Sequence, residues 1–143
     1  MPFLSGDDAL RTLLTGVRRI AVVGLSPKAH RDSHGVARYM QQCGYEIVPV
    51  YPREETILGE RVYRRVQDIP GGVDLVDVFR RPDGIPEVVD DALAANAPAL
   101  WFQLGCIHDD AARRASDAGL AVVMDLCLMV EHAALFGRGV RRT

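Results

Sequence analysis

The chain has little that points to a membrane, a secretory route or nucleic acid. No apolar run in its 143 residues reaches the roughly 18 residues that a membrane-spanning helix needs. The first eight residues lack the basic segment and apolar stretch of a secretory signal. With 17 Lys and Arg against 19 Asp and Glu, the net charge is −2, so no basic excess exists for contact with a phosphate backbone. We therefore expect a cytoplasmic protein that binds neither membrane nor nucleic acid.

Metal-ligating residues are also scarce. The chain has three cysteines, Cys43, Cys106 and Cys127, and no two of them have the spacing of metal ligands. An odd number of cysteines without a secretory signal is typical of reduced thiols. The four histidines are scattered over predicted loops and helix ends. We predict no metal site.

What is present is the composition and pattern of one α/β domain. A hydrophobic share of 48% and a charged share of 25% are ordinary globular values, and residues 1–143 suit a single core. Apolar runs predict strands at 19–23, 45–51, 73–79, 99–104 and 120–124, and helices alternate with them. Such alternation is typical of a mostly parallel sheet of five or six strands, covered on both faces as a three-layer sandwich.

Helix ends and one connection are predicted with less detail. Asp32 or Ser33 is expected to cap the second helix, and Asp83 the third, while Asp109 or Asp110 is expected to start the fourth. Residues 58–69 are ambiguous: residues 60–63 fit a short edge strand and residues 65–68 a helical turn. Residues 138–143 form a basic tail that we expect to be frayed. The neighbouring carboxylates Asp90 and Asp91 fit a solvated helix face.

The most informative segment runs from Ile20 to Pro27. An apolar strand stops at Gly24, a polar loop follows, and a helix begins near Ser33. Glycine lets the backbone approach a ligand closely, and a helix start offers free N–H groups to a phosphate. The carboxyl ends of parallel strands share one rim, which would also carry Arg80 and Arg81. These features predict a site for a phosphate-bearing ligand.

Two parts of a dinucleotide site are missing. Gly24 is followed by Ser26 and Pro27 instead of two further glycines, and the second strand ends in Val50-Tyr51-Pro52 with no carboxylate before Glu54. NAD is therefore not the expected ligand. Ser26 does not stand in a nucleophile elbow, and Cys127 has no evident general base, so we predict no catalytic residue.

Several stretches together resemble the small stand-alone coenzyme A-binding proteins, a family built on the nucleotide-binding domain of the succinyl-CoA synthetase α subunit. The resemblance covers residues 17–132 in order and implies a Rossmann-like fold with coenzyme A across the strand ends. The matching stretches are VVGLSPKAHRDSHGVARYM, GYEIVPVYP, ILGERVY, VDLVDVFRRPD, LWFQLGC and GLAVVMDLC.

The resemblance also implies a role for each part of the rim. The phosphate end of the ligand would be held by Gly24, Ser26, Pro27, Arg31 and Ser33. The adenosine would pack near Pro49, Val50, Tyr51 and Pro52, with Phe79, Arg80 and Arg81 on the other side and Gln103 and Gly105 near the pantetheine arm.

This chain departs from the family at two positions. Tyr51 stands where the family usually has Asn, and Leu126 where it usually has Arg. The first departure replaces a side-chain amide, and the second removes a positive charge from the rim. The ligase's second domain and its phosphorylated histidine have no counterpart, which leaves no machinery for making a thioester.

These observations lead to a single-domain, non-catalytic protein that binds coenzyme A or an acyl-CoA, with no protein partner identified. Two alternatives stay open: an enzyme that uses NAD or another dinucleotide, and an interaction module that has lost its ligand. We further expect Gly24→Val to abolish binding in a folded protein. A mixed disulfide between Cys127 and coenzyme A is a further hypothesis.

Overall fold

A computed structural model describes residues 3–138 and contains one five-stranded sheet. The strands are β1 (Arg19–Val23), β2 (Glu46–Val50), β5 (Leu75–Val78), β6 (Ala99–Phe102) and β7 (Ala121–Met124). Their order in the sheet is β2-β1-β5-β6-β7, and every neighbouring pair is parallel. The predicted α/β class with a parallel, Rossmann-like sheet is confirmed.

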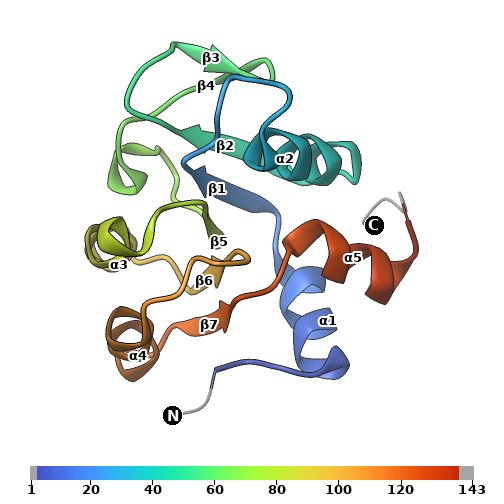
Figure 1. Cartoon of the computed structure of the whole chain (residues 1–143), viewed down its shortest axis with the longest axis vertical. Helices are drawn as coiled ribbons and strands as arrows, with labels where there is room; N and C mark the ends of the chain where they lie inside the picture. The colour runs from blue at the N-terminus through green and yellow to red at the C-terminus, as the bar shows by residue number, and fades with distance from the viewer. Residues whose placement is uncertain (1–2, 139–143) are drawn as a thin grey trace.

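Helices cover both faces of this sheet (Figure 1). One face carries α1 (Asp7–Gly16), α2 (Asp32–Gln42) and α5 (Leu128–Phe136), and the other carries α3 (Ile85–Ala94) and α4 (Asp109–Asp117). Successive strand residues point to opposite faces, so each face has its own core. Val76 and Phe102 pack in the core under α3 and α4, while Leu75 and Trp101 pack in the other. None of the helices among residues 3–138 is both long and apolar enough to cross a bilayer.

The predicted strands match the observed ones in position, and the predicted helix caps are wrong in detail. The N-cap of α2 is Arg31, so Asp32 and Ser33 lie in its first turn. The helix α3 follows a 3-10 turn, η2 (Pro82–Gly84), and has Gly84 as its N-cap in place of Asp83. The helix α4 begins at Asp109 as expected. Its N-cap is His108, whose Nδ1 accepts a hydrogen bond from the Ala111 N–H at 3.1 Å.

Residues 58–69, which the sequence did not assign clearly, contain both a short strand and a helical turn. Two short strands, β3 (Thr56–Ile57) and β4 (Glu60–Arg61), form an antiparallel pair, and the 3-10 helix η1 (Val66–Asp68) follows. Between them, Tyr63 forms an isolated parallel bridge with Val50 and covers the outer edge of β2. The expected basic tail lies outside the described residues, apart from Arg138.

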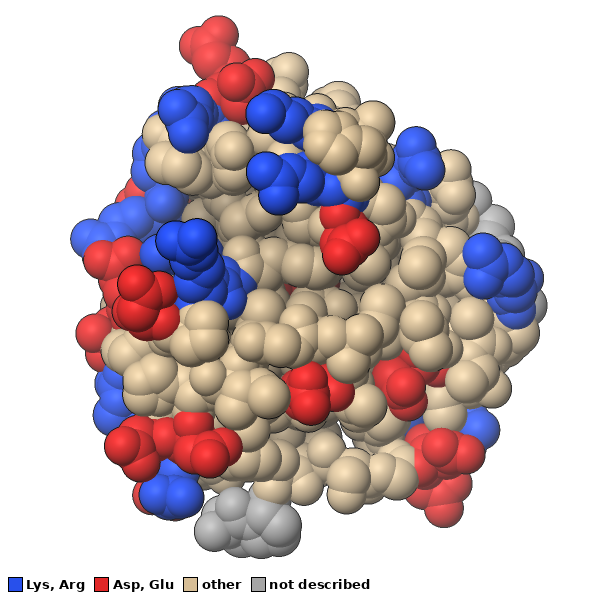
Figure 2. All heavy atoms as spheres, in the orientation of Figure 1, with Lys and Arg blue, Asp and Glu red and all other residues tan. Residues whose placement is uncertain are grey.

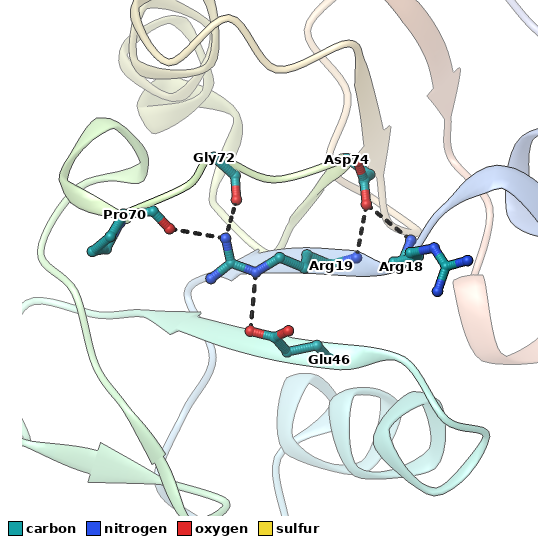
Figure 3. A network of polar contacts seen from close by, with 6 residues as sticks. All are labelled: Arg18, Arg19, Glu46, Pro70, Gly72 and Asp74. Atoms are coloured by element: carbon teal, nitrogen blue, oxygen red, sulfur yellow. Dashed lines mark hydrogen bonds and ion pairs between the residues drawn. The ribbon is translucent and has the colours of Figure 1, made fainter.

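The amino ends of the central strands are fastened together by one network (Figure 3). Arg19 on β1 donates from Nε to Glu46 Oε2 on β2 at 2.9 Å, and its Nη1 donates to two backbone carbonyls of the loop before β5. Asp74 Oδ2 accepts the backbone N–H groups of Arg18 and Arg19, both at 2.9 Å. Contacts within the chain close this end of the sheet. The carboxyl ends of the strands are left for a ligand.

Candidate functional site

The site lies where the strand order reverses. From β1 the chain passes outward to β2, then returns to β5 on the other side of β1, so the loops after β1 and β5 diverge at the sheet's carboxyl edge. Open α/β sheets bind ligands at this reversal point. Gly24 follows β1 here, with its N–H donating to the Val50 carbonyl at 2.9 Å.

Gly24 is required by the strand ends themselves. Its φ is +85°, and a Cβ built there would overlap the backbone carbonyl oxygen of Phe79, the residue after β5. Any side chain must therefore push the β1 and β5 ends apart. The expectation that Gly24→Val leaves the fold intact is not supported, because the added side chain would overlap the backbone of Phe79 even when no ligand is bound.

A first cavity of about 790 Å³ opens between the loops after β1, β2 and β5, and extends to η1 and α3. Most of the predicted site residues line it. They are Gly24, Ser26, Arg31 and Ser33 from the first loop and helix α2, Val50, Tyr51 and Pro52 from the β2 end, and Phe79, Arg80 and Arg81 from the β5 end.

A second cavity of about 660 Å³ lies on the α2 and α5 side of the same edge. Gln103 from the end of β6 and Cys127 from the start of α5 both line it. Arg31 and Phe79 line both cavities, as do His30 and Asp32, so the two adjoin beside the start of α2. On the face seen in Figure 2, a broad area without charge is bordered by Lys and Arg side chains and also by Asp and Glu side chains.

Three predicted site residues line neither cavity. Pro49 is a buried residue inside β2, paired in register with Val22. Pro27 lies in the first loop, outside the cavity lining. Gly105 is exposed in the loop after β6, where its N–H donates to Asp125 Oδ1 at 3.0 Å. The residues next to them in the sequence, Val50, Ser26 and Leu104, do line the cavities.

The first loop is fastened to the start of α2 by its own polar groups. The Ser26 N–H donates to Ser33 Oγ at 3.0 Å, and the Lys28 N–H donates to Ser26 Oγ at 3.1 Å. The His34 Nδ1 lies 2.9 Å from the Ser26 carbonyl oxygen. Ser33 is buried, so its hydroxyl serves this tether. The loop is therefore held in shape without a ligand.

Five arginines line the first cavity, and they divide into two groups. Arg64 Nη1 donates to three carbonyls of the loop after β2, and Arg65 forms an ion pair with Asp91 at 3.0 Å. The guanidinium groups of Arg31, Arg80 and Arg81 make no hydrogen bond or ion pair with any residue from 3 to 138. The second group is available to an anionic ligand.

Sequence reasoning missed the wall formed by η1 and α3. Val66, Val88 and Asp91 line the first cavity, and Asp91 is 9% exposed. The assignment of Asp91 to a solvated helix face is wrong, while its neighbour Asp90 is solvated. A signal was present, because Asp91 follows the apolar Val88 by three positions and shares its helix face.

A second missed carboxyl lies inside the sheet. Asp77 on β5 is fully buried, and its Oδ1 accepts a hydrogen bond from Gln103 Nε2 at 2.5 Å. Its Oδ2 has no hydrogen-bond partner in the described part of the chain. Burial raises the pKa of Asp77 to about 7, although the Gln103 bond lowers it. Gln103 Oε1 in turn accepts the Leu128 N–H at 3.3 Å. The amide that lines the second cavity is thus held from both sides.

Leu126, where the resemblance implied an Arg, takes part in packing. Its side chain lies against the core under α1, α2 and α5, and its carbonyl accepts the Trp101 Nε1–H at 2.9 Å. Among residues 3–138 no group of three or more His, Cys, Asp or Glu side chains could hold a metal ion.

The parallel sheet, the reversal point and the arginine-lined cavities define an α/β domain of the nucleotide-binding class. A family model described as a CoA binding domain matches residues 18–133, and the chain belongs to this family. The resemblance found in the sequence is therefore confirmed. Over 124 residues the chain is 40% identical to an uncharacterized protein, YneT, of Bacillus subtilis, covering 87% of this chain and 92% of YneT.

Solved structures share the fold. A hypothetical protein from Pyrococcus horikoshii is 37% identical and superposes with a TM-score of 0.91, with 96% of this chain and 98% of that one covered. A dinucleotide-forming acetyl-coenzyme A synthetase from Ca. Korarchaeum cryptofilum is 24% identical with a TM-score of 0.69. There the likeness covers 82% of this chain and 27% of the synthetase, and shows the fold alone. The fold thus occurs both in small proteins and within a larger enzyme.

Proposed function

We propose that the protein binds coenzyme A or an acyl-CoA across the two adjoining cavities and holds it without catalysing a reaction. The observation that carries this proposal is the set of three guanidinium groups, from Arg31, Arg80 and Arg81, that have no partner in the described chain. They surround the reversal point, where an elongated ligand with several phosphates would gain charge-assisted hydrogen bonds.

The two cavities suit the two ends of such a ligand. The first, with its apolar residues Val50, Val66 and Val88, would take the adenosine, and the arginines would take the phosphates. The second would take the pantetheine arm, whose amides need polar partners such as the Gln103 side chain. The shared residues beside the start of α2 would let one molecule occupy both.

A role without catalysis is supported by the chemistry at the rim. Burial raises the pKa of the Cys106 thiol, which disfavours the nucleophilic thiolate. Cys127, the thiol that lines the second cavity, forms no hydrogen bond through its sulfur within residues 3–138. Neither thiol therefore shows the activation that nucleophilic catalysis requires.

Calorimetric titration of the purified protein with coenzyme A and with NAD tests the proposal. Coenzyme A is expected to bind, and NAD to bind far more weakly or not at all. Arg31→Gln and Arg81→Gln should each weaken coenzyme A binding by about tenfold, because each removes a charge-assisted bond. Arg113→Gln is the matched control, since Arg113 lies on α4 with an exposed side chain. Equal affinity for NAD, or no binding of coenzyme A, would contradict the proposal.

A further inference from the structure

The Asp91 carboxylate lines the first cavity, and its hydrogen bond and ion pair within the described chain involve only one of its two oxygens. Asp91 Oδ1 lies 3.0 Å from Arg65 Nη2 and accepts a hydrogen bond from Gln67 Nε2 at 3.1 Å. Its Oδ2 makes no hydrogen bond or ion pair with any residue from 3 to 138. This oxygen is not among the fully buried atoms without a partner, so it is open to the cavity, where a ligand can supply a donor to it.

The surroundings of Asp91 restrict what that ligand group can be. Val66 on η1 and Val88 on α3 line the same wall, and each is only 2% exposed. Val50 adds a third apolar surface from the end of β2. Apolar walls accept the face of a planar heterocycle, while an ionised carboxylate accepts hydrogen bonds and donates none. The wall therefore suits a flat ring that carries an N–H group on its edge.

We propose that Asp91 accepts a hydrogen bond from the exocyclic 6-amino group of the ligand's adenine ring, as a residue that determines specificity for the base. This inference rests on the proposed function, which assigns the adenosine to the first cavity. The 6-amino group of adenine is a donor on the edge of an apolar ring. Arg65 and Gln67 position the carboxylate, so its orientation is set before the ligand arrives.

The direct test compares coenzyme A with its 6-deamino analogue, in which purine riboside replaces adenosine. The analogue lacks only the amino group, so it introduces no steric conflict. It is expected to bind the unmodified protein at least tenfold more weakly, because Asp91 Oδ2 would lose its donor. If coenzyme A binds and the analogue binds equally well, this inference is overturned and the proposed function stands. If coenzyme A does not bind, the proposed function itself fails.

A variant locates the effect at Asp91. Asp91→Asn keeps one oxygen for Arg65 and Gln67 and can place a donor against the 6-amino group. Coenzyme A should bind this variant at least tenfold more weakly, and its advantage over the deamino analogue should nearly vanish. The control is Asp90→Asn, which removes a charge paired with Arg114 at 2.7 Å on the solvated side and should change neither affinity.

The melting temperature of each variant shows whether it is folded. Undiminished discrimination between the two ligands in folded Asp91→Asn would overturn the role of Asp91. Should this variant fail to fold, the comparison of the two ligands on the unmodified protein still decides whether the amino group is recognised.

Discussion

Gln103 Nε2 donates to Asp77 Oδ1 at 2.5 Å, and this contact joins a buried carboxyl to the wall of the second cavity. The same amide accepts the backbone N–H of Leu128, the first residue of α5. One side chain therefore couples the centre of the sheet to a helix start and to the wall of the second cavity. The arrangement leaves Asp77 Oδ2 buried and unpaired, which has consequences for stability.

The first prediction concerns the pH dependence that Asp77 imposes on folding. Its pKa is about 7 in the folded protein against 3.8 in the unfolded chain. Between these values the folded state retains a proton that the unfolded state has lost, so the free energy of unfolding falls as pH rises. This contribution to stability is fully present below about pH 4 and is lost as pH rises through about 7.

Asp77→Asn should remove this dependence. Asn can still accept the hydrogen bond from Gln103, and it cannot ionise. Urea unfolding of both proteins is expected to show the variant gaining stability relative to the unmodified protein between pH 5 and pH 8. The same difference in unfolding free energy at both pH values would contradict the prediction.

His132 should produce the opposite slope. It lies on α5 and is buried, with its ring centre 4.8 Å from that of Phe136 and 5.6 Å from that of Tyr45. Its Nδ1 has no hydrogen-bond partner among residues 3–138. Burial lowers the pKa of His132 below 6.5. As pH falls below 6.5 the unfolded chain takes up a proton that the folded state resists, so stability is lost on the acid side.

His132→Phe keeps an aromatic ring at this place and removes the titrating group. Its unfolding free energy should fall less between pH 7 and pH 5 than that of the unmodified protein. A steeper fall in the variant would show that His132 is not held neutral in the folded state. Because the Asp77 slope acts in the opposite direction, combining His132→Phe with Asp77→Asn separates the two effects.

The strands were predictable because each is an apolar run followed by a glycine, a proline or a polar loop. The burial of Asp77 was not predictable, for a physical reason, whereas the spacing of Asp91 from Val88 did carry a signal. Asp77 interrupts an apolar strand, and only its partner Gln103, 26 positions away, explains how it is tolerated. The wall that carries Asp91 depends on η1, a turn too short to give a periodic pattern. The predicted caps of α2 and α3 were wrong because Arg31 and Gly84 occupy these positions, neither of them with a side-chain capping hydrogen bond.

A substitution at Gly24 tests whether the close approach of the β1 and β5 ends requires a glycine. Gly24→Ala should lower the free energy of unfolding by more than about 2 kcal/mol, from a left-handed backbone and from overlap with the Phe79 carbonyl. Gly59→Ala is the matched control, with φ +77° and nothing within 4 Å of the added Cβ. Gly59→Ala should lower the free energy of unfolding by only about 1–2 kcal/mol, the cost of a left-handed backbone at a residue with a Cβ. Equal losses in the two variants would show that the overlap is relieved at no cost.

The last prediction concerns Cys127, which lines the second cavity beside Gln103 and is partly exposed, whereas Cys43 and Cys106 are buried. If the pantetheine arm occupies this cavity, oxidised coenzyme A should react there. The Cys127 thiolate would attack the disulfide, form a mixed disulfide with one coenzyme A, and release the other as a thiolate. Intact-mass analysis after incubation at about pH 8 should show one adduct. Cys127→Ser should abolish it, while Cys43→Ser and Cys106→Ser should retain it. An adduct that survives Cys127→Ser would show that another cysteine is the reactive one. The absence of an adduct on the unmodified protein would show that Cys127 does not react with oxidised coenzyme A.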